Sequence, residues 1–409
     1  MKFGDGPNPT PGAEFETYAT HLCGIAREAI DKAEGAFTIG IFGSWGSGKT
    51  TLMRCIEKKF AELSEHNKYK TIWFNPWKYE GKEAVWNALI KTILIEIEEE
   101  LRLKHGCIEL REKLNLYGNA AFTQLPSALL NVLLEKNLGI KLGELKTEEL
   151  EALYLIDKQH YNLVNRFEID FKKLVDKYVD LDGKLIIFID DLDRCLPENA
   201  LNVLEAIKLY LDYEKCVFFI GVDKKIIEQG VRKRYLASLK ITGKEYIEKM
   251  IQLDFYLPDK SPEELKNLLK ARISNKWRDD QEMWDMVLEG TSYNIRKAKR
   301  FLHSFNLIER IAKPIGVREE LYPRLARVLL IQMNYPDFFV EFKREFNRKD
   351  SRIIDNNEDF FTKFINFPEN SKFQNDSELM KFIEVTSENS TKISQQNQLE
   401  IILKLVRVQ

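Results

Sequence analysis

The feature that most restricts the fold of this chain is a glycine-rich segment, Gly43-Ser-Trp-Gly-Ser-Gly-Lys-Thr50. It follows a short apolar run from Phe37 to Phe42 and opens a stretch with helical periodicity from Lys49 to Leu63. An apolar run bounded by glycines is typical of a buried strand. Glycines between a strand and a helix let backbone N–H groups turn toward an anion at the helix N-terminus. The segment therefore predicts a strand, an anion-binding loop and a helix, in that order.

The loop fits the pattern G-x-x-x-x-G-K-[ST], in which each residue type has a chemical role. In that pattern Lys49 reaches the β- and γ-phosphates of a nucleotide, and the Thr50 hydroxyl ligates Mg²⁺. A glycine-rich turn formed by chance is the alternative, and the strand before it and the helix after it argue against it. The residues predicted to bind the nucleotide are Gly43, Ser44, Trp45, Gly46, Ser47, Gly48, Lys49, Thr50 and Thr51.

A second motif lies at the end of another apolar run, which extends from Lys184 to Asp190. An apolar strand that ends in acidic residues is the partner that a phosphate loop needs. Asp190 is predicted to hold Mg²⁺ through water, and Asp191 to polarise the attacking water. A solvated strand end is the alternative interpretation of these adjacent aspartates. Asp193 and Arg194 follow. They have two possible interpretations, an ion pair that holds the loop or a direct role in catalysis.

Strand-like and helix-like stretches alternate through the first part of the chain. Strands are expected at 37–42, 70–74, 184–190, 217–220 and 251–255, and helices at 15–33, 49–63, 83–104 and from 197 onward. Continuous apolar runs are expected of parallel strands that are covered on both faces. Strands that alternate with helices imply a parallel sheet. The predicted fold class is α/β, a P-loop NTPase sheet with a helical insertion, a helical lid and a helical C-terminal extension.

The expected division of the chain is a tail at 1–14, a nucleotide-binding core at 15–258 with a helical insertion at about 106–180, a helical lid at 259–320 and a helical region at 321–409. The sequence becomes all-helical in character after Pro258. Ser261-Pro-Glu-Glu264 is a good helix start, because it combines a capping Ser, a Pro at the first helical position and a Glu at the third. After about Phe367 the chain is rich in Asn, Ser and Gln, which predicts a weakly ordered or peripheral tail.

Composition limits the class of protein. The 409 residues include 62 Lys and Arg against 64 Asp and Glu, and a net charge of −2 argues against a chain held to nucleic acid by bulk charge. Five cysteines without a CxxC pair suit a reducing compartment and disfavour a structural zinc site. The N-terminal residues lack the apolar core of a signal peptide, so we expect a cytoplasmic protein. The uncharged stretch from Leu114 to Leu134 contains several polar residues, which favours a protein-facing helix over an integral membrane span.

Four motifs together resemble the KAP family of P-loop NTPases. They are the phosphate loop, Phe74-Asn-Pro-Trp77-Lys-Tyr-Glu80, Asp190-Asp-Leu-Asp-Arg-Cys195 and Tyr246-Ile-Glu-Lys-Met-Ile-Gln252. They occur in family order, and the similarity runs from about Phe15 to Leu307. The resemblance implies an AAA+/STAND-like sheet with a helical lid, and ATP with Mg²⁺ as its ligands. Many relatives carry transmembrane helices between the two nucleotide motifs, whereas here that interval holds only the uncharged stretch described above. Some bacterial relatives act in exclusion of phage, so anti-phage defence is among the implied roles.

The architecture and the family resemblance predict that two further residues face the phosphates. Asp223 ends a strand at the position where such folds have side chains that touch the γ-phosphate or its water. The alternative is an Asp that caps the next helix. Arg296 lies on a predicted lid helix from Tyr293 to about Ala312, with Lys299 and Arg300 on the same polar face. The resemblance favours Arg296 as the lid residue that senses the γ-phosphate, and a solvated basic face is the alternative.

Two groups of residues bear on whether the protein binds other copies of itself or nucleic acid. Arg232 and Arg234 follow the strand that ends in Asp223 by one helix, where AAA+ rings carry an arginine that acts in trans. STAND-like relatives often lack such an arginine, so both stay candidates. Stacking on nucleic-acid bases is one interpretation of Trp73, Trp77 and Trp86. The favoured interpretation is that they pack the second strand and its helix. Nucleic-acid binding has no other support in the sequence.

The motifs favour Mg²⁺-dependent ATP binding and hydrolysis that drives conformational switching or assembly, with a protein partner or with further copies of the chain. Lys49, Asp191 and Arg296 are the predicted catalytic residues. One alternative is an ATP-binding signalling switch with little turnover, and another is a small-molecule kinase, which needs an acceptor pocket. Phosphate release without an acceptor separates the three. Steady release supports the ATPase, a single slow turnover supports the switch, and no release until a metabolite is added supports the kinase.

Overall fold

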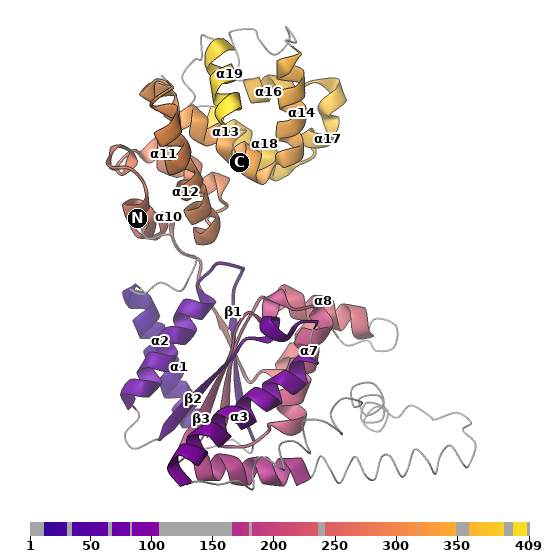
Figure 1. Cartoon of the computed structure of the whole chain (residues 1–409). Coiled ribbons are helices and arrows are strands. Elements are labelled where there is room, and N and C mark those ends of the chain that lie inside the picture. Colours follow the sequence, from indigo (N-terminus) through magenta and orange to yellow (C-terminus); the bar gives the residue numbers. More distant parts are fainter. Residues whose placement is uncertain are drawn as a thin grey trace, which may run out of the picture. The chain divides into compact units, whose positions relative to one another are not determined.

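The computed structural model describes residues 12–30, 35–63, 68–81, 84–105, 166–179, 182–235, 242–315, 317–348, 360–387 and 396–406. The chain divides into two compact units, with the boundary between Leu257 and Pro258. The first unit contains the sheet and the second is all-helical (Figure 1).

Five parallel strands form the sheet of the first unit, in the order β2-β3-β4-β1-β5. Their bounds are β1 Phe37–Phe42, β2 Tyr69–Phe74, β3 Lys184–Ile189, β4 Cys216–Val222 and β5 Leu253–Tyr256. The register pairs Phe74 with Ile189, and Phe42 with Val222, so the central strands end at nearly the same level. The residues that follow these strands therefore lie along one edge of the sheet. The predicted α/β fold with a parallel sheet is confirmed.

Helices cover both faces of this sheet (Figure 1). One face carries α1 (Ala13–Ile30) and α2 (Lys49–Leu63). The opposite face carries α3 (Val85–His105), a helix at 166–178, α7 (Pro197–Tyr210), α8 (Lys224–Tyr235) and α9 (Gly243–Met250). The 3₁₀ helices η1 (Pro76–Tyr79) and η3 (Leu192–Arg194) lie in the loops after β2 and β3.

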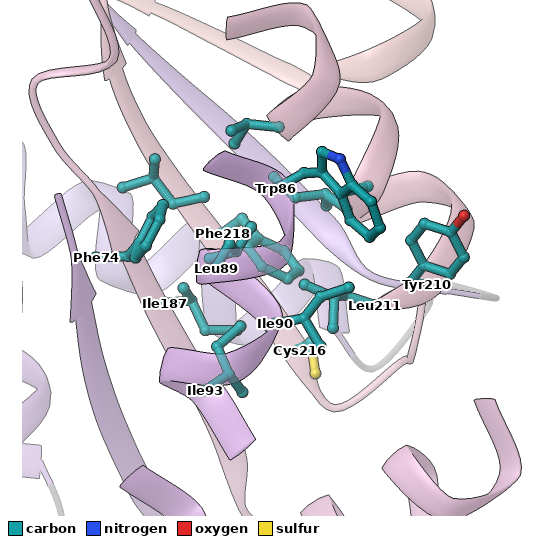
Figure 2. Packing of buried hydrophobic residues seen from close by; sticks show 14 of the residues in the cluster. Phe74, Trp86, Leu89, Ile90, Ile93, Ile187, Tyr210, Leu211, Cys216 and Phe218 are labelled. Atoms are coloured by element: carbon teal, nitrogen blue, oxygen red, sulfur yellow. The ribbon is translucent and has the colours of Figure 1, made fainter. Parts of the chain in front are cut away.

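Burial on both faces explains why β3 is a continuous apolar run. Leu185, Ile187 and Ile189 belong to the apolar cluster under α3 and α7, whereas Ile186 and Phe188 belong to the cluster under α1 and α2. A strand buried on two sides has no position for a polar side chain. Figure 2 shows the packing on the α3 side, formed by Trp86, Leu89 and Ile93 of α3 with Phe74, Ile187 and Phe218 of the strands.

Some predicted boundaries shift in the structure. β1 and α2 have the expected bounds, but the last strand begins at Leu253 and not at Ile251. Ile251 still belongs to the end of α9, because its N–H donates to the carbonyl of Ile247. Most of the predicted helical insertion and the whole stretch from 114 to 134 lie outside the described residues. In the ranges that the structure describes, no helix is long and apolar enough to cross a membrane.

The second unit is built from helices around one apolar cluster that includes residues from Leu269 to Val406. Ser261 and Glu264 form the expected capping box at the start of its first helix. The α-helices are α10 Pro262–Leu269, α11 Gln281–Gly290, α12 Ile295–Ala312, α13 Tyr322–Asn334, α14 Pro336–Asn347, α16 Phe360–Ile365, α17 Ser371–Gln374, α18 Ser377–Ser387 and α19 Gln396–Leu405. Short 3₁₀ turns occur at Lys270–Arg272, Asn275–Trp277, Glu319–Leu321 and Pro368–Asn370.

The prediction that the tail after Phe367 is weakly ordered or peripheral is wrong for the residues that the structure describes there. Leu379, Phe382 and Ile383 of α18 and Ile402 of α19 are buried in the cluster of the second unit. Apolar residues spaced three and four apart form a buried helix face even when polar residues dominate the composition. The prediction counted the polar residues and missed this spacing.

Candidate functional site

The residues that follow four of the strands gather at the carboxyl edge of the sheet. The loop Gly43–Gly48 follows β1, Asn75 follows β2, Asp190 follows β3 and Asp223 follows β4. Open α/β sheets bind ligands outside the carboxyl ends of their strands. The topology alone therefore brings three separate sequence motifs to one edge.

The loop after β1 has a backbone that only glycine adopts without strain at two positions. Gly46 has φ of 90° and Gly48 has φ of 113°. A Cβ atom at Gly48 would lie 3.0 Å from the ring of Phe15, and one at Gly43 would lie 2.5 Å from the Ser47 hydroxyl oxygen. These glycines explain how the loop folds tightly, and glycine-rich loops of this kind can turn backbone amides toward an anion.

Lys49, the first residue of α2, folds its side chain back under this loop. Its Nζ donates to the carbonyl oxygens of Gly43, at 2.9 Å, and Ser44, at 3.2 Å. The same nitrogen lies 3.0 Å from Oδ2 of Asp193, and the two side chains are only 7% and 6% exposed. Asp193 Oδ2 has no partner with good hydrogen-bond geometry, so its contact with Lys49 is a buried charge pair rather than an aligned hydrogen bond.

Asp190 is the buried carboxylate of the site. The Thr50 hydroxyl and the backbone N–H of Asp191 both donate to its side chain. Burial raises the pKa of Asp190, and the charges of Asp191 and Asp193 raise it further, while the Thr50 hydrogen bond lowers it. The site has room for this carboxylate because β4 carries Gly221, where a Cβ would lie 3.2 Å from Asp190 Oδ1.

These features fit a divalent cation between Thr50 and Asp190. A carboxylate whose ionised form is disfavoured by burial and by like charges gains from a nearby cation. In the part of the chain that the structure describes, no group of three His, Cys, Asp or Glu side chains is arranged to hold a metal. Mg²⁺ is usually bound by one or two protein ligands together with waters and phosphates, so one carboxylate and one hydroxyl are enough protein groups to hold it.

Asp191 points its carboxylate at the loop after β2. Its Oδ2 accepts from Asn75 Nδ2 at 2.9 Å, and its Oδ1 pairs with Arg194 at 2.8 Å. Asp191 has φ of 59°, the left-handed region, which turns this side chain away from the direction of β3. The guanidinium of Arg194 in turn lies 5.3 Å from the ring centre of Trp77.

The segment Asn75–Glu80 holds the acidic loop in place. Besides the Asn75 contact, Glu80 Oε1 accepts from the Asn199 amide at 2.8 Å and from the backbone N–H of Leu196 at 3.4 Å. From the sequence, neither Asn75 nor Glu80 was assigned a role in the site, and their segment was one of the motifs of the family resemblance. A polar residue directly after β2 was the signal that could have identified Asn75, because that position lies at the same edge as the residues that follow β3.

Buried polar atoms without a hydrogen-bond partner concentrate at this edge. Of ten such side-chain atoms in the described residues, five belong to these three loops. They are Ser47 Oγ, Asn75 Oδ1, Glu80 Oε2, Asp193 Oδ2 and Arg194 Nε. A native protein leaves few buried polar atoms unsatisfied. The arrangement fits a polar ligand that completes their hydrogen bonding.

The other predicted residues of the first unit have mixed surroundings. Asp223 Oδ1 accepts from the backbone N–H of Lys225 at 3.0 Å, which is the capping contact that the alternative interpretation expects. Arg234 pairs with the buried Glu205 at 3.3 Å, while Arg232 is exposed. Trp45 is exposed at the tip of the loop after β1.

Of the three tryptophans considered for base stacking, two are packed against other residues and one is exposed. Trp73 stacks on Phe188 with 4.8 Å between ring centroids, and Trp86 is buried. These two therefore pack the second strand and its helix. Trp77 is exposed and covers Arg194.

Arg296 belongs to the second unit. It is the second residue of α12, and its backbone N–H donates to the capping side chain of Asn294. The helix starts two residues later than predicted because Ser292 and Tyr293 have positive φ angles of 50° and 54°. The side chain of Arg296 is partly buried.

Comparison with known proteins gives both sequence and structural matches. Residues 15–312 match the family described as the KAP family P-loop domain. The phage T7 exclusion protein of Escherichia coli K12 is 26% identical over 335 residues, which cover 75% of this chain and 42% of that protein. An uncharacterized protein of Methanocaldococcus jannaschii is 27% identical over 169 residues, which cover 36% of this chain and 86% of that protein. The chain thus spans less than half of the exclusion protein's length.

Two solved structures from Aeropyrum pernix show weaker likeness. The ORC2 protein, in ADPNP and ADP complexes, has a TM-score of 0.38 and 12% identity, with 98% of this chain and 96% of that chain covered. The ORC1 protein in complex with DNA has a TM-score of 0.38 and 14% identity, with 98% of this chain and 84% of that chain covered.

Proposed function

The chain belongs to the KAP family of P-loop NTPases, and on that premise we propose that it binds ATP with Mg²⁺ and hydrolyses the ATP to ADP and phosphate. The observation that carries this proposal is the position of Lys49. Its ammonium group is held under the glycine-rich loop by the carbonyls of Gly43 and Ser44, and the next residue, Thr50, is hydrogen-bonded to the buried Asp190. A positive charge at a glycine-rich loop and a carboxylate–hydroxyl pair are parts that phosphoryl transfer requires.

Each part has a distinct task in this proposal. The backbone amides of the loop bind the phosphate oxygens, and Lys49 adds its charge where the β- and γ-phosphates meet. Thr50 and Asp190 hold the metal ion, which neutralises charge on the phosphates when it is bound. The sequence predicts that Asp191 polarises the attacking water. Catalysis then consists of positioning and charge stabilisation, because this reaction needs little covalent chemistry from the protein.

Electrostatics supports the requirement for a metal ion. Asp190, Asp191 and Asp193 place three carboxyl groups beside two basic side chains, Lys49 and Arg194. Adding a triphosphate to a site that is already rich in carboxyl groups is unfavourable without a further cation. We therefore expect tight ATP binding to depend on Mg²⁺.

The proposed output is a conformational change or an assembly step. Arg296 of the helical unit is the residue that we propose to sense the γ-phosphate, and Arg232 is the candidate to act on another copy of the chain, because Arg234 already pairs with Glu205. The relative named for exclusion of phage T7 supports anti-phage defence as the setting. A cytoplasmic site of action is part of the same proposal.

One observation favours a second function, an ATP-binding switch with little turnover. Both carboxylate oxygens of Asp191 are engaged by Asn75 and Arg194, so the residue that the sequence assigns to the attacking water is held by other groups. A protein that binds ATP and rarely hydrolyses it would use the nucleotide to stabilise one conformation.

Calorimetry and phosphate release test the proposal together. The wild type should bind ATP with Mg²⁺ and release phosphate steadily without an acceptor. Lys49→Ala should weaken ATP binding at least about tenfold, because it removes charge-assisted contacts to two phosphates. Lys58→Ala, at an exposed lysine on the same helix, is the matched control. Equal ATP affinity of the wild type and Lys49→Ala would refute the site, and a single slow turnover would favour the switch.

A further inference from the structure

Three aspartates follow β3 within four residues, and each has a different partner. Asp190 is bound by the Thr50 hydroxyl, and Asp191 by Asn75 and Arg194. Asp193 is paired with Lys49, the lysine of the phosphate loop. Of the three, Asp193 is thus the carboxylate that is paired with the cation expected to hold the γ-phosphate.

The shared lysine limits the distance between Asp193 and a bound phosphate. Asp193 Oδ2 lies 3.0 Å from Lys49 Nζ. A phosphate oxygen that pairs with the same ammonium group lies about 3 Å from it. Two anions on one ammonium group are therefore at most about 6 Å apart, which is the span of one water that hydrogen-bonds to a base and approaches a phosphorus atom.

Asp191 is less suited to hold that water. Its Oδ2 accepts a hydrogen bond from Asn75 and its Oδ1 is paired with Arg194, so each oxygen has fewer lone pairs left for a water than a free carboxylate oxygen has. A base must have a lone pair within hydrogen-bond reach of the proton that it accepts. The Oδ2 atom of Asp193 is buried and has no aligned hydrogen bond, so it can accept one.

The local backbone fixes Asp193 in this position. It is the middle residue of the 3₁₀ helix η3, whose neighbour Leu192 is fully buried. The N–H of Arg194 donates to the carbonyl of Asp191, and the N–H of Cys195 donates to that of Leu192. A short turn anchored on both sides holds its middle side chain with little freedom, which is what a positioned base requires.

We infer that Asp193, and not Asp191, is the catalytic residue that orients and deprotonates the attacking water. The inference rests on the proposed ATPase function. The bound phosphate shares Lys49 with Asp193, and the Asp193 carboxylate accepts a hydrogen bond from the water that lies between them. The water oxygen forms a bond to the γ-phosphorus, and the bond from that phosphorus to the β–γ bridging oxygen breaks, with its electron pair leaving on ADP. The proton of the water passes to Asp193 and from there to the phosphate product.

Asp193→Asn tests this role because it keeps the shape of the side chain and removes the base. Turnover should fall at least about a hundredfold, the usual contribution of a positioned base. Binding of a non-hydrolysable ATP analogue with Mg²⁺, measured by calorimetry, should be retained or become up to about tenfold tighter, because no carboxylate competes with the phosphates for Lys49. Asp193→Glu should recover part of the turnover, since it restores a carboxylate.

Two further variants complete the experiment. Asp191→Asn should slow turnover less than Asp193→Asn does. Glu198→Gln makes the same chemical change at an exposed ion pair and serves as the matched control for turnover and binding. Normal turnover of Asp193→Asn, together with an inactive Asp191→Asn, overturns the inference and assigns the water to Asp191. Loss of analogue binding by Asp193→Asn also overturns it, because Asp193 is then a metal ligand or a support for the loop.

The results that would refute the ATPase proposal differ from those that would refute only the role of Asp193. If the wild type neither binds ATP nor releases phosphate, or if Lys49→Ala changes neither property, both proposals are refuted. If the wild type hydrolyses ATP and Lys49→Ala abolishes binding, the site stands and the Asp193 variants alone decide the identity of the base.

Discussion

Replacing Lys49 with alanine should destabilise the protein itself, in the absence of any nucleotide. The change removes the cation next to Asp193, whose side chain is 6% exposed, and the donor to the carbonyls of Gly43 and Ser44. Breaking a buried ion pair by deleting one member costs about 3–5 kcal/mol, because the other charge stays buried. The lower end applies here, since Asp193 Oδ2 lacks an aligned hydrogen bond and the pair lies at the edge of the sheet. We expect a loss of about 3 kcal/mol in the free energy of unfolding.

The assay is urea unfolding without nucleotide, followed by tryptophan fluorescence, for four proteins. These are the wild type, Lys49→Ala, Asp193→Asn and the double variant. Asp193→Asn alone should cost less than Lys49→Ala, because the lysine keeps its two carbonyl acceptors. The double variant should recover about 2 kcal/mol relative to Lys49→Ala, since no charge is left unpaired.

One control variant and two possible outcomes test the predicted stability of the pair formed by Lys49 and Asp193. Lys58→Ala, at an exposed lysine on the same helix, should leave the urea midpoint unchanged. If Lys49→Ala is as stable as the wild type, or if the double variant recovers nothing, the contact between Lys49 and Asp193 is not an energetically significant buried pair. The distance argument for Asp193 would then lose its basis.

Three other variants give separate checks. Gly48→Ala should lower the stability by about 1–3 kcal/mol in urea unfolding, because alanine is strained at φ of 113° and its Cβ would meet the ring of Phe15. Arg234→Ala should lower the stability by about 2–3 kcal/mol and leave ATP affinity unchanged in calorimetry, because it removes the cation paired with buried Glu205; reduced ATP affinity would contradict a structural role. Arg296→Ala should reduce the affinity for ATP more than that for ADP, and an unchanged ratio of the two would argue against a sensor at this position.

Sequence reasoning succeeded where a local pattern has only one structural solution. The bounds of β1 and α2 agree with expectation, and β3 ends one residue before the expected end at Asp190, because each of these elements is written in consecutive residues. The capping box of Ser261 and Glu264 is equally local and is observed. It failed for the tail after Phe367, where composition was read instead of the apolar spacing in α18.

The contacts among the site residues could not be predicted from the sequence. Asn75 and Asp191 are 116 positions apart, yet they form a hydrogen bond because β2 and β3 are neighbours and end at the same level. The same sheet order brings Lys49 to Asp193. Strand order is a property of the whole sheet, and no motif in this chain encodes it locally.

The sequence by itself determined which chemical groups the site has. The loop pattern specifies glycines, a lysine and a threonine, and the strand that ends in Asp190 supplies the carboxylates. Only the tertiary structure decided how the three aspartates divide their partners. That division depends on the left-handed backbone at Asp191 and on the tight turn that follows it, which send neighbouring side chains in different directions. Adjacent residues of one chemical type are equivalent in a sequence, and the folded backbone makes them different.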